Sequence, residues 1–192
     1  MFSERTSVGL DVHARSIAGC GVDTVTGQVT RQRLVPMGDV VLDWLRRLPA
    51  PVAVAYEAGP TGFGLARQLT EAGLRCVVAA PSKLQRPAGD RVKTDARDAW
   101  HLARLLQRDQ IVAVRVPDVA QEAARDLVRA REDVRGDLMR CRHRLSKLLL
   151  RHGIVYCGGR AWTVAHETWL RTLRFPAGVC GWRSTPGSRR CC

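Results

Sequence analysis

Short apolar runs separated by turn residues fill the first part of the chain, a pattern typical of strands joined by hairpins. The predicted strands are residues 7–13, 17–24 and 29–36. In the first of them, Val8, Leu10 and Val12 alternate onto one face. Residues 38–48 then carry apolar side chains at helical spacing, which predicts a helix.

The pattern changes after this helix to strand, helix and strand at residues 51–57, 62–72 and 74–81. The run PVAVAYE at 51–57 is apolar on both faces, as expected for a central strand covered by helices. The order of three antiparallel strands, helix, strand, helix and strand is the ribonuclease-H-like order, and the family resemblance described below implies its RuvC type. The chain is therefore predicted to form an α/β domain with a mixed five-stranded sheet and flanking helices.

A basic loop and a further helix follow the last predicted strand. The loop spans residues 82–93 and carries the basic residues Lys83, Arg86, Arg91 and Lys93. Thr94 is a good candidate N-cap for a helix whose apolar stripe consists of Ala99, Leu102, Ala103 and Leu106. The loop residues are either phosphate clamps or members of an ordinary solvated loop.

A long segment without proline, residues 119–153, has apolar residues at threes and fours and predicts one amphipathic helix. Unbroken, it would be about 50 Å long, so a dimerising coiled coil is expected. Its second half is basic and includes Arg140, Arg144 and Lys147. We expect this face to contact a nucleic-acid backbone, the alternative being a merely solvated face.

The end of the chain differs in character. Residues 161–175 begin another amphipathic helix, whereas residues 176–192 show no periodicity and cluster Gly, Pro, Ser, Arg and Cys. That tail is expected to be aberrant, as in a frame-shifted or truncated end, or disordered.

The composition of the chain indicates its binding partners and its cellular location. A net charge of +13 over 192 residues indicates a polyanionic partner, most often nucleic acid. No apolar run approaches the ~20 residues that span a bilayer, and the N-terminus has no signal-peptide pattern. We therefore expect a cytoplasmic, nucleoid-associated protein without a membrane partner. Seven cysteines without CxxC spacing argue against a zinc site or a disulfide framework.

Four carboxylates are the candidate chemistry of this basic chain. Asp11 and Glu57 end apolar strands, while Asp95 and Asp98 lie three residues apart and share a helix face. Hard carboxylate oxygens suit Mg²⁺ or Mn²⁺, and a metal pair can act on a phosphodiester. The alternative is that Asp95 and Asp98 only complement the helix dipole, for about 0.3–1 kcal/mol each.

His13 lies two residues from Asp11 and has two interpretations. It could contact phosphate or assist proton transfer, or it could be a solvated histidine in a turn. The glycines at 59, 62 and 64 fit neither GxGxxG nor a Walker motif, and indicate a tight strand-to-helix turn.

The segments GLDVH, YEAGPTGFGLARQL, PSKLQRPAGDRVKTDARDAWHLARLL and RLSKLLLRHG resemble the N-terminal DEDD domain of the IS110 class of insertion-sequence transposases, the bridge-RNA-guided recombinases. The resemblance covers about residues 5–175. It implies that Asp11, Glu57, Asp95 and Asp98 are a catalytic, Mg²⁺-binding DEDD tetrad. It also implies DNA and a guide RNA as partners, a homodimer or higher homo-oligomer, and a function in DNA transposition.

The resemblance also implies an organisation. Residues 1–115 would be the ribonuclease-H-like catalytic domain, 116–153 the coiled-coil helix, and 154–175 the start of a segment leading to a C-terminal domain. Family members carry a nucleophilic serine in that domain, but only Ser184 and Ser188 follow residue 150 here. We therefore expect an N-terminal fragment whose enzymatic status is open. Two alternatives remain: a non-cleaving RNA- or DNA-binding dimerisation module, and a stand-alone metal-dependent junction nuclease.

Overall fold

A computed structural model describes residues 4–84 and 94–175 of the chain. The chain divides into two compact units, residues 1–124 and residues 125–192. The basic residues Arg86, Arg91 and Lys93 and the tail at 176–192 lie outside the described residues.

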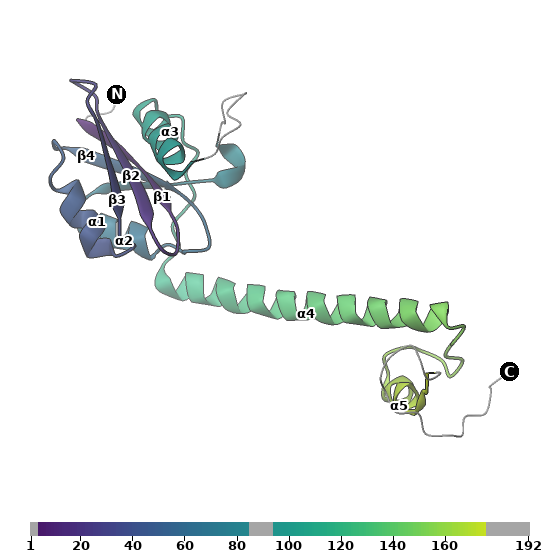
Figure 1. Ribbon diagram of the computed structural model, residues 1–192. Helices are drawn as coiled ribbons and strands as arrows, with labels where there is room; N and C mark the ends of the chain where they lie inside the picture. The colour runs from purple at the N-terminus through teal and green to yellow at the C-terminus, as the bar shows by residue number, and fades with distance from the viewer. Residues whose placement is uncertain (1–3, 85–93, 176–192) are drawn as a thin grey trace. The chain divides into compact units, whose positions relative to one another are not determined.

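The first unit is built on a mixed sheet (Figure 1). Its strands are β1 (Thr6–Val12), β2 (Ile17–Asp23), β3 (Val29–Leu34), β4 (Val52–Glu57) and β5 (Arg75–Ala79). Their spatial order is β3-β2-β1-β4-β5; the first three are antiparallel neighbours, and β1, β4 and β5 run parallel. The predicted mixed five-stranded α/β sheet is confirmed, and it is consistent with a ribonuclease-H-like fold.

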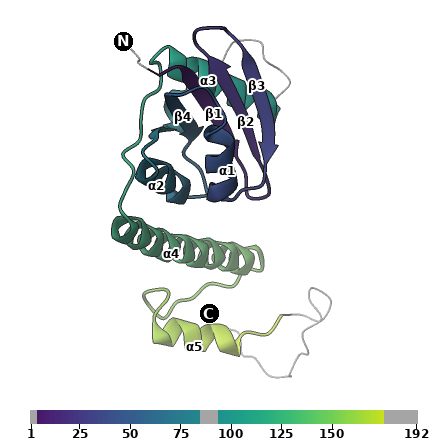
Figure 2. The ribbon, with the colours of Figure 1, turned by 90° about the vertical axis from the view of Figure 1, so that its left-hand side faces the viewer.

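Helices cover both faces of the sheet (Figures 1 and 2). On one face lie α1 (Gly38–Leu45) and α2 (Gly64–Glu71), and their side chains share a core with alternate strand residues such as Val8, Leu10 and Tyr56. On the other face lies α3 (Asp95–Gln107), over small residues of β2 and β4. A 3₁₀ turn, η1 (Pro81–Lys83), follows β5.

The position of α3 depends on the absence of a side chain at Gly9. A Cβ added there would collide with the carbonyl oxygen of Ala99 and lie 2.5 Å from the amide nitrogen of Ala103. The helix backbone therefore rests directly on β1, a distance that only glycine in the strand and alanines in the helix permit. This contact holds the N-terminus of α3 close to the end of β1.

Thr94 occupies the N-cap position of α3 with extended backbone angles, as the sequence predicts. Its side chain, however, makes no capping hydrogen bond. Its carbonyl oxygen instead accepts from the amides of Arg97 and Asp98, which closes the first turn. The helix start is thus correctly located, but the expected side-chain cap is wrong.

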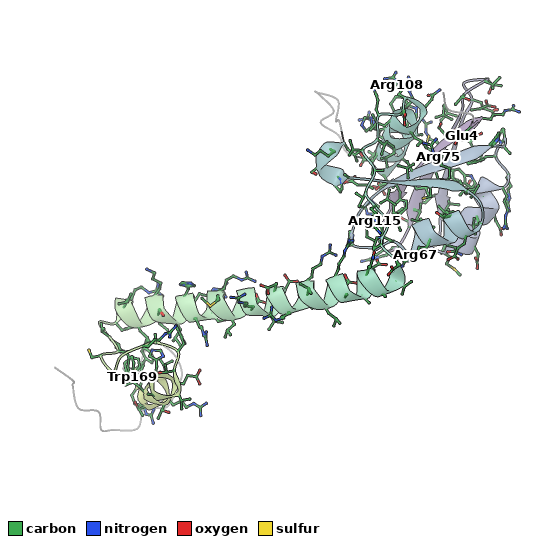
Figure 3. The ribbon with its side chains drawn as sticks, turned by 180° about the vertical axis from the view of Figure 1, so that it is seen from behind. Glu4, Arg67, Arg75, Arg108, Arg115 and Trp169 are labelled. Carbon is green, nitrogen blue, oxygen red and sulfur yellow. The ribbon has the colours of Figure 1, made fainter. Side chains whose placement is uncertain are left out.

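The helix α4 (Val119–Arg151) begins within the first unit. There the Glu122 carboxylate accepts a hydrogen bond from the amide of Phe63 at 3.0 Å and pairs with Arg67 at 2.7 Å. The Arg67 guanidinium, seen in Figure 3, also donates to the carbonyl of Pro117. These contacts join the first turn of α4 to the start of α2.

The second unit contains the rest of α4 and α5 (Val164–Thr172). Thr163 caps α5, its hydroxyl accepting from the amide of His166. His166 is buried among the rings of Tyr156, Trp162 and Trp169, the last labelled in Figure 3. No helix within the described residues combines the length and apolar character needed to cross a bilayer.

Candidate metal centre

Asp11 and Glu57 lie at the same edge of the sheet because their strands are parallel neighbours. The β1–β4 register pairs Leu10 with Tyr56, so the next residues along are Asp11 and Glu57. Side chains alternate along a strand, and Leu10 and Tyr56 point into the core under α1 and α2. Asp11 and Glu57 consequently face the side of the sheet that α3 covers.

The first turn of α3 adds further carboxylates at this edge. Asp95 is the first residue of the helix, and Asp98 follows on the same side one turn later. The structure thus brings all four acids predicted from the sequence to one end of the sheet.

His13 connects β1 with α3. Its Nε2 lies 3.0 Å from Oδ2 of Asp11 and 3.8 Å from Oδ1 of Asp95. One ligand atom from each of these three residues falls within 4.8 Å of the others. Among the described residues this is the group of acids and histidine that could hold a metal ion.

The electrostatics of Asp11 favour a cation beside it. Burial raises the pKa of the Asp11 carboxyl, the charge and hydrogen bond of His13 oppose the rise, and the carboxylates of Asp95 and Asp98 add to it. A cation between these carboxylates would relieve both the burial penalty and the repulsion. Asp11 and Asp95 offer hard oxygen donors for a divalent metal, and the His13 imidazole can either add a nitrogen donor or hold the Asp11 carboxylate in place.

The four predicted acids do not contribute equally to this group. Asp11 and Asp95 belong to it, whereas Asp98 is near enough to raise the Asp11 pKa without being part of it. Glu57 is half-buried at the neighbouring strand end and lies outside the group.

The sequence leaves two interpretations of His13 open, a contact with phosphate or proton transfer on one side and a solvated turn histidine on the other. The usable signal is its spacing of two from Asp11, which puts both side chains on one face if the strand pairing continues. It does continue, since the His13 amide donates to the carbonyl of Ser16 at 3.0 Å. The proximity of Asp95 depends on α3 packing and has no local signal in the sequence.

The predicted nucleic-acid contacts are spread over both units. Lys83 ends η1 in the first unit and is exposed. Arg140, Arg144 and Lys147 are exposed on α4 in the second unit, where Arg140 pairs with Asp137. Their role in binding stays a prediction.

Comparison with known proteins identifies the family. A family model described as a transposase, the DEDD type of the IS110 class, matches residues 8–154. The chain belongs to the IS110 family of DEDD transposases. The match includes the edge of the sheet with Asp11, Glu57, Asp95 and Asp98.

Two curated relatives agree with this family. The chain is 48% identical over 124 residues to "Putative transposase y4qE" of Sinorhizobium fredii, an alignment covering 65% of this chain and 32% of that protein. It is 36% identical over 174 residues to the "Transposase for insertion sequence element IS1533" of Leptospira borgpetersenii, covering 88% of this chain and 50% of that protein. The chain thus spans about a third to a half of the length of these two relatives.

Proposed function

We propose that this transposase acts in DNA transposition by metal-dependent cleavage and transfer of DNA strands, working on nucleoid DNA in the cytoplasm. The observation that carries the proposal is the group formed by Asp11, His13 and Asp95 within 4.8 Å, at the edge where Glu57 also ends its strand. Membership of a DEDD transposase family supports it.

In this proposal, Asp11 and Asp95 hold Mg²⁺ or Mn²⁺, and Glu57 and Asp98 complete the ligand set. The ion would supply Lewis-acid polarisation of a phosphodiester and activation of water. Because Asp11 sits at a strand end and Asp95 at a helix start, both carboxylates are held by rigid elements. His13 orients the Asp11 carboxylate through its 3.0 Å hydrogen bond and can exchange a proton there.

The proposed partners are the DNA substrate, a guide RNA and a second copy of the chain. The basic residues Lys83, Arg140, Arg144 and Lys147 would contact phosphates, along with Arg86, Arg91 and Lys93. On α4, apolar or small residues recur every seven positions at Leu127, Val134, Cys141 and Leu148. A seven-residue recurrence of one apolar position is half of the a and d pattern of a coiled coil, and it supports a homodimer formed along α4.

The direct test is cleavage of a labelled branched DNA by the full chain in Mg²⁺ or Mn²⁺. We expect metal-dependent nicking that Glu57→Gln abolishes and that Glu71→Gln, an exposed matched control on α2, leaves intact. Metal-dependent nicking that persists in Glu57→Gln would remove this residue from the site. Nicking without transfer of the cut strand to a second labelled DNA would favour the stand-alone junction nuclease, whereas joining of the cut strand to that DNA would favour the transposase.

A second candidate function is a non-cleaving module that binds RNA or DNA and dimerises. It is favoured by one observation: Arg140, Arg144 and Lys147 are exposed on α4. Salt-sensitive binding of nucleic acid without nicking, in a chain that still binds Mn²⁺, would support this module over the nuclease.

A further inference from the structure

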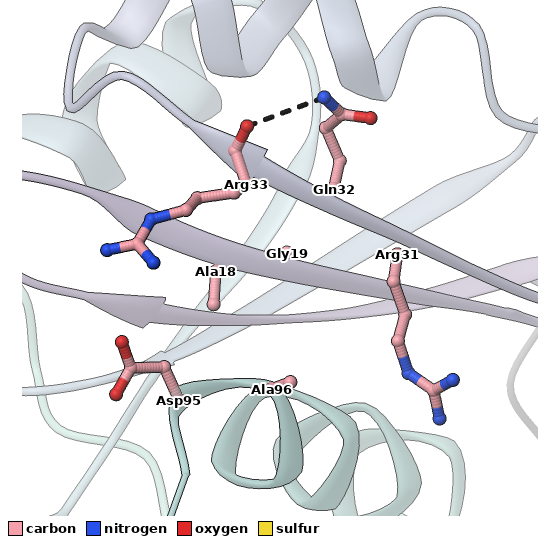
Figure 4. Close-up of a pocket in the computed structure, with 7 residues that line it drawn as sticks. All are labelled: Ala18, Gly19, Arg31, Gln32, Arg33, Asp95 and Ala96. Carbon is pink, nitrogen blue, oxygen red and sulfur yellow. Dashed lines mark hydrogen bonds between the residues drawn. The ribbon is translucent and has the colours of Figure 1, made fainter.

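A groove lies beside the candidate metal centre, between the edge strand β3 and the first turn of α3 (Figure 4). Its volume is about 220 Å³. Residues 31–33 of β3 form one wall, Asp95 and Ala96 of α3 form the other, and Ala18 and Gly19 of β2 lie between them. The groove therefore opens at one end onto Asp95, a member of the candidate metal centre.

The groove exists because α3 does not extend over β3. The helix packs through Ala99 and Ala103 against Cys20 of β2 and its neighbours. The register pairs Cys20 with Arg31 and Ala18 with Arg33, so both arginines share the face that α3 covers. Burial raises the pKa of the Cys20 thiol and the Arg31 guanidinium opposes that rise, so the Arg31 side chain lies near Cys20 on the face that α3 covers.

The arginines of the β3 wall lie across the groove from one carboxylate, that of Asp95. Within the described residues no carboxylate forms an ion pair with Arg31 or Arg33; the Arg33 guanidinium donates to the hydroxyl of Ser16 at 3.0 Å. Two residues apart on one strand, the arginines start about 7 Å from each other. That spacing is close to the separation of successive phosphates in an extended nucleic-acid strand.

The floor of the groove suits the close approach of a sugar–phosphate backbone, while the Asp95 carboxylate of the α3 wall repels phosphates toward the β3 arginines. Ala18, Gly19 and Ala96 present no group larger than a methyl, which allows a bulky chain to approach closely. One helical turn beyond Ala96 lies Trp100, which is 39% exposed and has the Arg104 guanidinium 5.6 Å from its ring centroid. An exposed indole beside basic groups is a stacking platform for a base.

We propose that this groove binds the backbone of one nucleic-acid strand, with Arg31 and Arg33 on successive phosphates and Trp100 against a base, next to the strand's entry to the metal centre. The direction of entry rests on the proposed function. The binding itself does not, because it depends on the groove residues and needs no metal.

The test uses the full chain in EDTA and measures binding of labelled single-stranded DNA and RNA oligonucleotides by fluorescence anisotropy at several salt concentrations. The double variant Arg31→Gln, Arg33→Gln should weaken binding about tenfold and reduce the slope of log K against log salt by about 1.4, or 0.7 per lost phosphate contact. The matched control Arg46→Gln, Arg47→Gln removes the same charge from exposed positions at the end of α1. It should leave the slope near that of the parent.

Trp100→Ala provides an independent arm, because stacking is not ionic. It should weaken binding about tenfold while leaving the salt slope unchanged. Stronger binding of DNA would identify a substrate strand, and stronger binding of RNA a guide strand; both support the groove.

Equal slopes for the two arginine pairs, or binding of an acidic peptide in place of either oligonucleotide, would overturn the proposal. Mn²⁺ binding is measured separately on the same variants. If the parent chain binds no Mn²⁺, the proposed metal chemistry is refuted, but the groove proposal is unaffected.

Discussion

The helices α3 and α4 have similar amphipathic patterns in the sequence, but the apolar face of α3 is buried in the structure and that of α4 is largely exposed. Of the thirteen residues of α3, five are buried: Ala99, Leu102, Ala103, Leu105 and Leu106. Of the 33 residues of α4, Leu149 alone is buried. Apolar spacing therefore indicates that a helix has a face to cover, but not whether the same chain covers it.

The covering of α3 is what makes the candidate site possible. Gly9 lets the helix backbone rest on β1, and this fixes Asp95 beside Asp11. On α4, by contrast, Leu127 and Val134 remain largely exposed within the unit that contains them. An exposed apolar stripe on a long helix requires a partner surface, which we propose is a second copy of the chain.

The largest effect should come from filling the space under α3. Gly9→Ala forces a Cβ against the backbone of Ala99 and Ala103, which cannot yield as a flexible side chain could. We expect a loss of about 3 kcal/mol in the free energy of unfolding, measured by urea denaturation. Gly64→Ala is the matched control, because nothing lies near its added Cβ, and it should be as stable as the parent or up to about 1 kcal/mol more stable. Equal stability of the two variants would show that α3 is not held by this contact.

The next effect concerns the uncovered helix. Val134→Asp places a charge in the seven-residue repeat of α4 and should weaken self-association about a hundredfold, measured by analytical ultracentrifugation. Val128→Asp is its control: Val128 is 60% exposed, against 69% for Val134, but lies off the repeat. A monomeric parent, or the same loss in both variants, would refute the coiled-coil dimer.

A smaller effect should mark the point where α4 leaves the α/β unit. Glu122→Ala removes the acceptor of the Phe63 amide and the partner of Arg67, so we expect a loss of about 1.5 kcal/mol in thermal or urea unfolding. Glu132, also on α4, pairs only with exposed arginines. Glu132→Ala should cost less than about 0.5 kcal/mol. If both cost the same, the anchoring of the first turn is not specific.

The smallest predicted effect is on the pH dependence of stability without metal. Burial raises the pKa of Asp11 above its unfolded value of 3.8, so the folded state holds this proton more tightly. The stability contributed by the protonated form is complete below pH 3.8 and is lost as the pH rises through the raised folded pKa. Urea unfolding in EDTA should show this decline in the parent and in Asp43→Asn, and a weaker one in Asp11→Asn. Parallel curves of stability against pH for all three chains would exclude a raised pKa at Asp11.

The sequence predicted what local patterning controls. Period-two alternation located the strands, so Asp11 and Glu57 could be placed at strand ends, and DxxD spacing put Asp95 and Asp98 on one helix face. The parallel pairing of β1 and β4 then follows from the order of elements.

The rest depends on packing between distant segments. The approach of Asp95 to His13 requires α3 to rest on Gly9, a contact across about ninety residues of sequence that no local pattern encodes. The groove beside β3 likewise depends on how far α3 extends across the sheet. From the sequence alone, Arg31 and Arg33 are indistinguishable from other basic strand residues. Thr94 is a local example. A threonine at this position predicts a side-chain capping hydrogen bond, but its hydroxyl makes none in the structure.

The central claim, that the edge of the sheet binds a divalent metal, is tested most directly by titrating Mn²⁺ into the full chain at neutral pH and following free Mn²⁺ by electron paramagnetic resonance. The parent and Asp43→Asn, which removes an exposed carboxylate on α1, should bind alike. Asp11→Asn and Asp95→Asn should each bind at least about tenfold more weakly, because each removes a hard oxygen ligand. Equal Mn²⁺ affinity in all four chains, or no measurable binding by the parent, would contradict the account.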